Sequence, residues 1–553
     1  MHEVRPSWIR GVNIGGWLVL ERYITPYQFA VTDCHLRGEF CWYPGQASAP
    51  PKHHADYQLC DLKRCHPFMM ETVDGQDYPM DEYTLGQAFP KEETAEQWLN
   101  YHFEYFITFE DVQDLKDAGV THLRVPLPHW ILGNKHKGEP WVVGDRWKYF
   151  QRLCAWSRQL GLQVWPDIHT APGSQNGFDN SGQTLKDASC KGWSTQPENV
   201  QRSLLVIRKV TEQIVADGLD DVVTGFGLLN EPFLDCDREV YESFLEEGLD
   251  IVRSTMGPQV SIYASDMFSS DSFNNGHWWL DPTRYANTFL DSHFYQVFAE
   301  HPRALSPRQH VAYTCQNEHR DLIGCCYEPH RQQISRGVSR IVGEWSVAVD
   351  SLPVAVLRVI MDSIAANGTA AFLDRDLSPD RQDFLKHFAQ AQIVSYEAAG
   401  AGISAGWFYW TAKMEGGAFA EWDFLRAFHE GWLPKIAKDP FTPSEELYGS
   451  CYDIIFKTND NMAVIHEFPD PSTIDPDGWE PIIDDDVVVS HGESLLQVHG
   501  EWIQTQPRRP VLFRWYVLLV VILVAFIVRH FFRRGLCRGK SNYTEVPTTE
   551  ITC

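Results

Sequence analysis

The sequence predicts an α/β protein whose main body, residues 1–440, is a (β/α)8 TIM barrel. Eight short apolar runs of strand character recur along this body, and segments with apolar residues at helical spacing lie between them. Strands that alternate with helices favour a parallel sheet, and eight repeats favour a closed barrel over an open, doubly wound sheet, whose Gly-rich fingerprint is missing here. The runs are WIRGVNIGG, VTHLRVPL, LQVWPDIH, TGFGLLNE, QVSIYAS, TFLDSHFY, RIVGEWS and GISAGWFYW.

Helical periodicity between the runs is clearest in three segments, FITFEDVQDLKDAG, KYFQRLCAWSRQLG and DREVYESFLEEGLDIVRS. In the first segment Thr108 precedes Asp111 at the spacing of a reciprocal N-terminal cap, so we expect a helix to begin there. The second segment contains Cys154, which we expect to be a buried, unpaired thiol.

Two regions are added to the barrel. Residues 33–80 form a Cys-rich insertion between the first strand and the next helix, and such a loop lies on the face of this fold where active sites are built. Residues 441–510 are acidic, and we interpret them as a juxtamembrane stalk. A small β appendage is the alternative, because this region contains short apolar pieces such as YDIIF and DVVVS.

An apolar run near the C-terminus predicts one transmembrane helix over residues 511–532. Its centre, WYVLLVVILVAFIV, reaches spanning length if Arg529 snorkels to the interface. Arginines bracket the run, which disfavours a buried core helix, and basic residues are more numerous after it. We therefore expect a single pass through the plasma membrane or a secretory-pathway membrane, with residues 533–553 as a cytoplasmic tail and the barrel outside or in the lumen.

The first residues, MHEVRPSWIRGVNIGGW, contain no apolar stretch that could direct secretion. Either the natural N-terminus lies upstream of this sequence, or the protein is tail-anchored with its barrel in the cytosol. The cysteines favour the first explanation, because disulfides form in the secretory pathway.

Thirteen cysteines occur, eleven of them before the apolar run. Four crowd into the insertion, and their spacing predicts a disulfide-stapled loop. A zinc site with His53, His54 or His66 is the alternative, although the short CxxC spacing of common zinc sites is missing. The four cysteines are Cys34, Cys41, Cys60 and Cys65.

The formal net charge of −27 excludes nucleic acid as a partner, because binding phosphate requires a basic surface. The 20 tryptophans suit a neutral polysaccharide, since sugar rings present apolar faces to aromatic side chains. We expect a monomer whose other partner is the lipid bilayer, and we expect neither a metal nor an organic cofactor.

Polar and aromatic residues gather at the carboxyl ends of the predicted strands. In a barrel those ends share one face, where active sites are built from several strand ends. The residues are Arg124, His169, Asn230, Glu231, His293, Tyr295, Glu344 and Trp410.

Two of these residues, Glu231 in LLNEP and Glu344 in VGEWS, are carboxylic acids at separate strand ends. A pair of carboxyl groups about 5 Å apart can cleave a glycosidic bond with retention, one as proton donor and the other as nucleophile. We expect an apolar wall and the negative partner to raise the pKa of Glu231, while Arg124 keeps Glu344 ionised.

The order and context of these motifs resemble glycoside hydrolase family five, in particular its fungal-type exo-β-1,3-glucanase branch. The resemblance covers residues 10–434. The matching stretches are RGVNIGGWLVLERYITP, HLRVPLPHW, DIHTAPGSQNGFDNSG, LLNEP, SHFYQVF, VGEWS and GWFYWTAKME.

The resemblance implies a retaining hydrolase that releases glucose from the non-reducing ends of β-1,3-glucan. It implies that Glu231 is the acid/base and Glu344 the nucleophile, with Arg124 as support for the nucleophile. It also implies a sugar pocket in which Asn230 binds the 2-hydroxyl, Glu21 binds the outer hydroxyls, and His169, His293 and Tyr295 surround the same sugar. By the same resemblance Trp410 is the platform under the sugar, and Phe178 and Phe298 lie at the entrance. Trp407 is then a core residue.

The chain departs from the family pattern at the insertion, at residues 301–333 and after Trp410, where it reads Thr411-Ala-Lys-Met-Glu415. The insertion could narrow or roof the pocket. Linkage preference therefore stays open, and the alternatives are β-1,6-glucan, mixed-linkage glucan, a glycolipid glucoside, or transfer to another sugar. A non-catalytic membrane receptor for glucan is the alternative outside enzymes, and the presence of both carboxylic acids argues against it.

Overall fold

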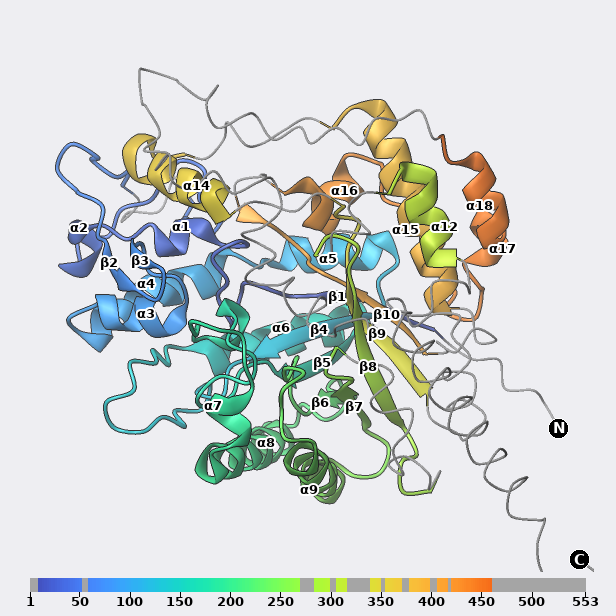
Figure 1. The fold of residues 1–553 in the computed structure, drawn as a ribbon, viewed down its shortest axis with the longest axis horizontal. Helices are drawn as coiled ribbons and strands as arrows, with labels where there is room; N and C mark the ends of the chain where they lie inside the picture. The colour runs from blue at the N-terminus through green and yellow to red at the C-terminus, as the bar shows by residue number, and fades with distance from the viewer. Residues whose placement is uncertain are drawn as a thin grey trace, which may run out of the picture. The chain divides into compact units, whose positions relative to one another are not determined.

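A closed barrel of eight parallel strands is the centre of the fold (Figure 1). The computed structural model describes residues 8–51, 58–268, 283–298, 305–315, 339–349, 354–369, 377–397, 405–415 and 419–459. The strand order is β1-β10-β9-β8-β7-β6-β5-β4, and β1 also pairs with β4, which closes the barrel. Every predicted run contains one strand, so the predicted (β/α)8 barrel is confirmed. The strands are β1 (Ile9–Asn13), β4 (His122–Leu127), β5 (Gln163–Ile168), β6 (Gly225–Gly227), β7 (Ser261–Ser265), β8 (Thr288–Phe294), β9 (Ser339–Trp345) and β10 (Gly406–Tyr409).

Helices surround the strands, as Figure 1 shows for α5, α6, α8 and α9. The long helices among the described residues are α4 (Glu92–Tyr105), α5 (Phe109–Ala118), α6 (Arg146–Leu160), α8 (Pro197–Ala216), α9 (Arg238–Met256), α12 (Pro307–Cys315), α14 (Val354–Asn367) and α15 (Pro379–Glu397). The shorter ones are α1 (Pro26–Phe29), α2 (Asp33–Leu36), α3 (Glu82–Ala88), α7 (Lys191–Ser194), α16 (Phe424–His429), α17 (Glu445–Tyr448), α18 (Cys451–Lys457) and the 3-10 turns η1 (Asp179–Ser181) and η5 (Ala420–Trp422).

The predicted cap at the start of α5 is confirmed. Thr108 accepts a hydrogen bond from the Asp111 backbone N–H at 3.2 Å, and Asp111 accepts one from the Thr108 N–H at 2.9 Å. The helix ends at Gly119, which has φ 103°, a left-handed conformation that glycine adopts without steric cost. Local sequence therefore determines both ends of this helix.

An apolar cluster fills the interior of the barrel away from the polar strand ends. Trp165 lies at its centre, with aromatic rings from β7 and β10 and aliphatic side chains from β1 and β9 around it. A Cβ on Gly225 would lie 2.3 Å from the indole ring of Trp165, so the indole fits only because β6 carries a glycine there. The cluster consists of Ile9, Trp165, Tyr263, Ile341 and Phe408.

A buried ion pair holds the amino-terminal strand to the outer helices. Arg10 of β1 donates from Nε to Glu397 of α15 at 2.8 Å and from Nη2 to the second carboxylate oxygen at 3.1 Å. The same guanidinium donates to the backbone oxygens of Ala437, Asp439 and Thr442. Arg10 thus connects β1, α15 and the segment that follows the barrel.

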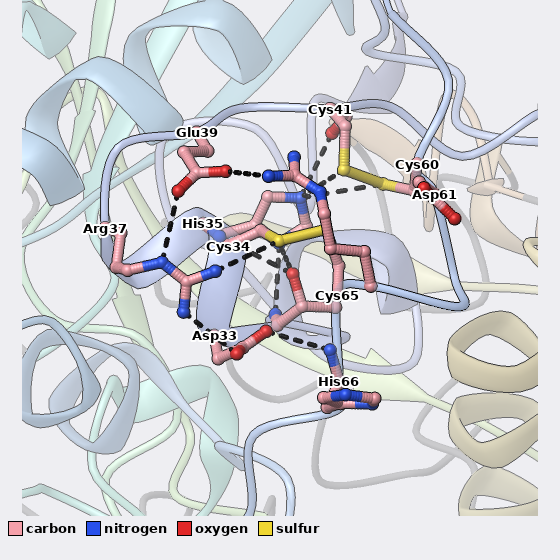
Figure 2. Close-up of a disulfide and its surroundings, with 12 residues drawn as sticks. Asp33, Cys34, His35, Arg37, Glu39, Cys41, Cys60, Asp61, Cys65 and His66 are labelled. Atoms are coloured by element: carbon pink, nitrogen blue, oxygen red, sulfur yellow. Dashed lines mark hydrogen bonds and ion pairs between the residues drawn. A yellow bond between two sulfur atoms is a disulfide. The ribbon is translucent and has the colours of Figure 1, made fainter.

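The Cys-rich insertion contains disulfides, as predicted, and the structure gives their pairing, Cys34–Cys65 and Cys41–Cys60 (Figure 2). The zinc alternative fails on chemistry, because all four sulfurs are bonded to each other and no thiolate is left to bind a metal. His66 is exposed, while His53 and His54 lie outside the described residues. A short antiparallel hairpin, β2 (Met70–Thr72) and β3 (Gly75–Asp77), completes the insertion and was not predicted.

The remaining described cysteines agree with an oxidised body. Cys190–Cys236 and Cys315–Cys451 form two further disulfides, and Cys154 is free and buried as predicted.

The start of the acidic C-terminal region differs from our expectation. The piece YDIIF, which suggested a β appendage, lies in helix α18, where Ser450 and Asp453 form a reciprocal cap and Ile454 and Ile455 are buried. The Cys315–Cys451 disulfide ties α18 to α12, so this part of the chain belongs to the barrel body. Tertiary packing overrides the strand preference of these apolar residues.

The predicted membrane span and tail, residues 511–553, and most of the predicted stalk lie outside the described residues. Within the part of the chain that the structure describes, each helix is too short or too polar to span a bilayer.

Loss of the Arg10 guanidinium should destabilise the barrel strongly. The Arg10→Met variant leaves a buried Glu397 carboxylate without its ion-pair partner, which we expect to lower the free energy of unfolding by about 3–5 kcal/mol in urea denaturation. The control is Arg158→Met, which breaks an exposed ion pair with Asp221 and should cost less than about 1 kcal/mol. Equal effects of the two variants would contradict the role assigned to Arg10.

Candidate active site

The predicted strand-end residues converge on one side of the barrel. Arg124 lies in β4 and His293 in β8, while His169, Tyr295 and Trp410 follow β5, β8 and β10 directly. Asn230 and Glu231 follow β6, and Glu344 is the penultimate residue of β9. Direct contacts connect these side chains, so the structure brings the predicted strand-end residues together at one end of the barrel.

Arg124 is fully buried at the centre of this group. Its Nη1 donates to Asn13 Oδ1 at 2.8 Å and to Glu344 Oε1 at 3.0 Å, and its Nη2 donates to Asn230 Oδ1 at 2.7 Å. Asp167 lies 3.4 Å from the same guanidinium. One cation therefore fixes side chains from β1, β5, β9 and the loop after β6.

The position of Glu344 depends on the pairing of β8 with β9. The register changes between Ser292 and His293, so that His293 lies opposite Glu344. Gly343 precedes the glutamate because a Cβ there would lie 2.1 Å from Asp291 Oδ1. The glycine of the VGEWS motif thus allows the Asp291 carboxylate to approach the backbone of β9.

Glu231 occupies a strained turn. Its φ of 44° lies in the left-handed region, which costs a residue with a side chain about 1–3 kcal/mol. The amide of Gln175 donates to the backbone oxygens of Asn230 at 3.0 Å and of His169 at 2.9 Å, which ties the turn to the loop after β5. The motif DIHTAPGSQNGFDNSG therefore supports LLNEP across the pocket.

Glu231, His293 and Glu344 form a compact triad. One carboxylate oxygen of each glutamate and one ring nitrogen of His293 lie within 4.8 Å of one another. His293 Nδ1 lies 2.7 Å from Glu231 Oε1 and 3.4 Å from Glu344 Oε2, and its Nε2 lies 3.4 Å from Asp291. Tyr295 donates its hydroxyl to Glu344 Oε2 at 2.8 Å.

The triad has the ligand types of a metal site, but its electrostatics suit a proton. Both ring nitrogens of His293 face carboxylates, which is the environment of a doubly protonated imidazolium. Although burial lowers the pKa of His293, the charges of Glu344 and Asp291 and the hydrogen bonds to Asp291 and Glu231 raise it well above its ordinary value. An imidazolium has no lone pair to offer a metal ion.

The directions in which we expected the pKa values of the two glutamates to shift were wrong. Burial raises the pKa of Glu231, but the hydrogen bond and charge of His293 and a hydrogen bond from Asn180 bring it below its ordinary value. Burial and the negative charge of Glu231 raise the pKa of Glu344. The positive charges of His293 and Arg124 lower it, but the net shift is upward. The sequence showed the Arg124 partner but not the contact of His293 with Glu231.

The pocket floor is built by His169, Asn230 and Trp410. Asp167 holds His169 Nδ1 at 2.9 Å, and His169 Nε2 lies 3.3 Å from the Asn230 amide nitrogen. The ring of Trp410 stacks on that of His169 with centroids 5.7 Å apart and an interplanar angle of 8°. Trp407, which the sequence assigned to the core, is fully buried and donates to Glu397.

Glu21 lies in the loop after β1 and is 9% exposed. Its Oε1 is buried and makes no hydrogen bond among the described residues. Burial, together with the charges of Asp179, Glu344 and Glu231, raises the pKa of Glu21 well above its ordinary value. An unsatisfied carboxyl oxygen close to the triad is available to a hydroxyl of a bound sugar.

The two predicted entrance residues have different surroundings. Phe178 packs edge-on against Phe233 at 6.4 Å. Phe298 packs against Tyr295 at 5.3 Å and Trp422 at 6.1 Å. Each ring is thus supported by a further aromatic residue that the sequence interpretation did not single out.

Sequence reasoning also missed Asn180, Asp167 and Asp291. Asn180 donates to Glu231 Oε2 at 2.8 Å, and it lies in the quoted stretch FDNSG, from which only Phe178 was chosen. Asp167 and Asp291 each stand two residues before a predicted histidine, within their strands. The spacing could have revealed both aspartates, because residues two apart in a strand face the same side and so share the side of the predicted histidine.

Known proteins similar to this chain are glucan 1,3-beta-glucosidases. Those of Candida oleophila and Blumeria graminis are each 30% identical to it, covering 79% of this chain and 91% and 89% of their own. That of Lachancea kluyveri is 28% identical over 469 residues, 80% of this chain and 90% of its own. No protein-family model matches the chain.

Among solved structures, the rutinosidase from Aspergillus niger superposes with a TM-score of 0.51 at 16% identity, covering 77% of this chain and 98% of its own. At that identity the likeness shows the barrel fold alone. The identity and coverage of the curated relatives carry the assignment further: the chain is a glycoside hydrolase, and it belongs to the glucan 1,3-beta-glucosidase family.

Proposed function

We propose that this enzyme removes glucose from the non-reducing ends of β-1,3-glucan with retention of the anomeric configuration. The observation that carries the mechanism is the spacing of Glu231 and Glu344, since one carboxylate oxygen of each lies within 4.8 Å of one oxygen of the other. Retaining glycosidases place the two carboxyl groups about 5–5.5 Å apart, whereas inverting ones leave about 6.5–9.5 Å for a water molecule. The names of the relatives support the substrate.

In the first step Glu344 attacks the anomeric carbon while Glu231 protonates the departing glycosidic oxygen. Arg124 and Tyr295 donate to Glu344 and hold its charge where the new bond forms. His293 Nδ1 and Glu231 Oε1 lie 2.7 Å apart and together hold one proton. This proton passes to the Glu231 carboxylate and from there to the departing oxygen, which leaves Glu231 ionised and His293 neutral. The C–O bond to the leaving sugar breaks, and a covalent glucosyl–Glu344 ester forms.

In the second step Glu231, now ionised, takes a proton from a water molecule. The water oxygen attacks the anomeric carbon from the side that the leaving group vacated, and the bond to Glu344 breaks. Two inversions give net retention. A sugar hydroxyl in place of water would give transglycosylation by the same route.

The pocket surroundings support attack on a terminal sugar. Trp410 offers a ring face to the apolar side of one glucose unit, and Glu21 offers an unsatisfied carboxyl oxygen to its outer hydroxyls. Phe178 and Phe298 then lie at the entrance, where the next units of the glucan would stack.

The direct test is the product of a laminarin-type glucan. We expect glucose as the first product, released as the β-anomer and followed by NMR before mutarotation. Release of the α-anomer would overturn the retaining mechanism. A panel of β-1,6- and mixed-linkage glucans and a glucosyl lipid separates the linkage alternatives, since the preferred substrate should have the highest kcat/KM.

Substitution of the two carboxylic acids should separate their roles. Glu231→Gln removes the proton donor, so kcat/KM on glucan should fall about 10²–10⁴-fold, with a smaller loss on an aryl glucoside whose leaving group needs no proton. Glu344→Gln removes the nucleophile, so activity on both substrates should disappear. A Glu344→Gln protein as active as the wild type would exclude the double displacement.

Substitution of His293 should narrow the pH profile. Its positive charge lowers the pKa of Glu344, so His293→Gln should shift the acidic limb of kcat/KM to higher pH. The raised pKa of His293 determines where the shared proton is lost, so in the variant Glu231 holds that proton alone and the alkaline limb should move to lower pH. Tyr295→Phe removes a donor to Glu344 alone and should raise only the acidic limb. An unchanged alkaline limb in His293→Gln would contradict the shared proton.

We also propose that residues 511–532 anchor the enzyme in a membrane with the barrel outside or in the lumen. The support is the apolar run bracketed by arginines. The full chain should remain in the membrane fraction after an alkaline wash, and a chain that ends at residue 510 should become soluble. Release of the full chain by the wash would refute the anchor.

A further inference from the structure

The described residues of the disulfide-stapled insertion, 33–51 and 58–80, are held by covalent bonds and aromatic stacking. Besides the two disulfides, His35 stacks on Trp98 of α4 with centroids 4.4 Å apart, and Trp42 stacks on the same indole at 5.1 Å and 8°. His35 and Trp42 are both buried. The insertion is therefore fixed to α4, and side chains that contact the insertion have little freedom to move.

Its hairpin contacts the wall of the pocket that carries Glu21. Arg22, the next residue, forms a 3.0 Å ion pair with Asp77 of β3, and the two side chains are only 6% and 18% exposed. Asp77 is itself held by Arg358 of α14 at 3.3 Å. A largely buried ion pair thus joins the insertion to the loop after β1.

A second contact reaches the wall that carries Trp410. Ser48 is fully buried, accepts from the Gln28 amide at 2.7 Å and donates to Glu415 Oε1 at 3.1 Å. The other oxygen of Glu415 accepts from the backbone N–H of Tyr27 at 3.3 Å. Glu415 lies five residues after Trp410, so the insertion and the segment after β1 both contact the chain that follows Trp410 at this residue.

We propose that the insertion is a brace for the sugar pocket, in which Arg22 and Asp77 position Glu21, and Ser48 positions the Trp410 wall through Glu415. The three are positioning residues that set the preference of the pocket for the outer hydroxyls of the terminal glucose. This inference rests on the proposed function, because it assigns those hydroxyls to Glu21.

A hydroxyl scan of the substrate tests the brace in the full-length protein. The probes are aryl β-glucoside, its 4-deoxy and 6-deoxy analogues, and aryl β-xyloside. Glu21→Ala identifies the hydroxyl that Glu21 binds, because a buried hydroxyl left without its partner lowers kcat/KM about 10–100-fold only for probes that carry that hydroxyl. Arg22→Met should reproduce the same pattern of losses, mainly through KM, with less than about 3-fold loss on the probe that lacks the hydroxyl.

A conservative variant separates positioning from a general loss of structure. The conservative change Arg22→Lys keeps a cation opposite Asp77 and leaves the Arg358–Asp77 pair intact, so it should retain most of the discrimination, whereas Asp77→Asn should resemble Arg22→Met. Arg158→Met, which breaks an exposed ion pair, is the matched control and should change nothing. Equal losses on every probe in Arg22→Met, or no loss on any, would overturn the proposal.

Hydrogen exchange gives a readout that does not depend on activity. Asp77→Asn should speed the exchange of backbone amides in residues 15–25, and Ser48→Ala that of residues 410–415, while α9 stays unchanged. If the wild type cleaves no β-glucoside, the proposed function fails, yet these exchange rates still decide the brace. Unchanged exchange in both segments would refute it.

Discussion

The buried guanidinium of Arg124 is the constraint on which the pocket depends. A full positive charge inside the barrel is stable only when carboxylates and amide oxygens surround it. Asn13, Asn230 and Glu344 accept its hydrogen bonds, and Asp167 lies at 3.4 Å. Each of these partners belongs to a different strand or strand end, so satisfying one cation brings the walls of the active site to a common centre. The same guanidinium joins β4 to Asn13 of β1, where the barrel closes, and holds Glu344, the proposed nucleophile.

A second cation, the His293 imidazolium, completes the charge balance. It lies between Glu231, Glu344 and Asp291 and offsets their negative charge. These charges raise the pKa of His293, which favours the proton on the histidine side of the Glu231–His293 contact. Catalysis as we propose it requires that proton to move by one hydrogen bond, and the left-handed turn at Glu231 holds the carboxylate at the correct end of that bond.

The insertion shows how an added loop can act on a site without entering it. Its disulfides and aromatic stacking remove its own conformational freedom, and its two polar contacts then transmit that rigidity to the loops after β1 and β10. The sequence left open whether the insertion narrows or roofs the pocket. Its polar contacts reach Arg22, which is next to Glu21, and Glu415, which follows Trp410 by five residues.

The sequence by itself determined the barrel, because eight apolar runs with intervening helical periods leave few other folds, and it determined the carboxylic acid pair, because strand ends of a barrel share one face. It also indicated the stapled loop and the unpaired Cys154, which depend on local spacing and helical pattern. Only the tertiary structure decided the protonation order of Glu231 and Glu344, since that order depends on His293 and Asn180, which approach Glu231 from other strands and loops. Tertiary packing also decided that YDIIF is helical. The ion pairs Arg10–Glu397 and Arg22–Asp77 were likewise not predictable, because no local pattern marks which charged residues will meet across a closed barrel.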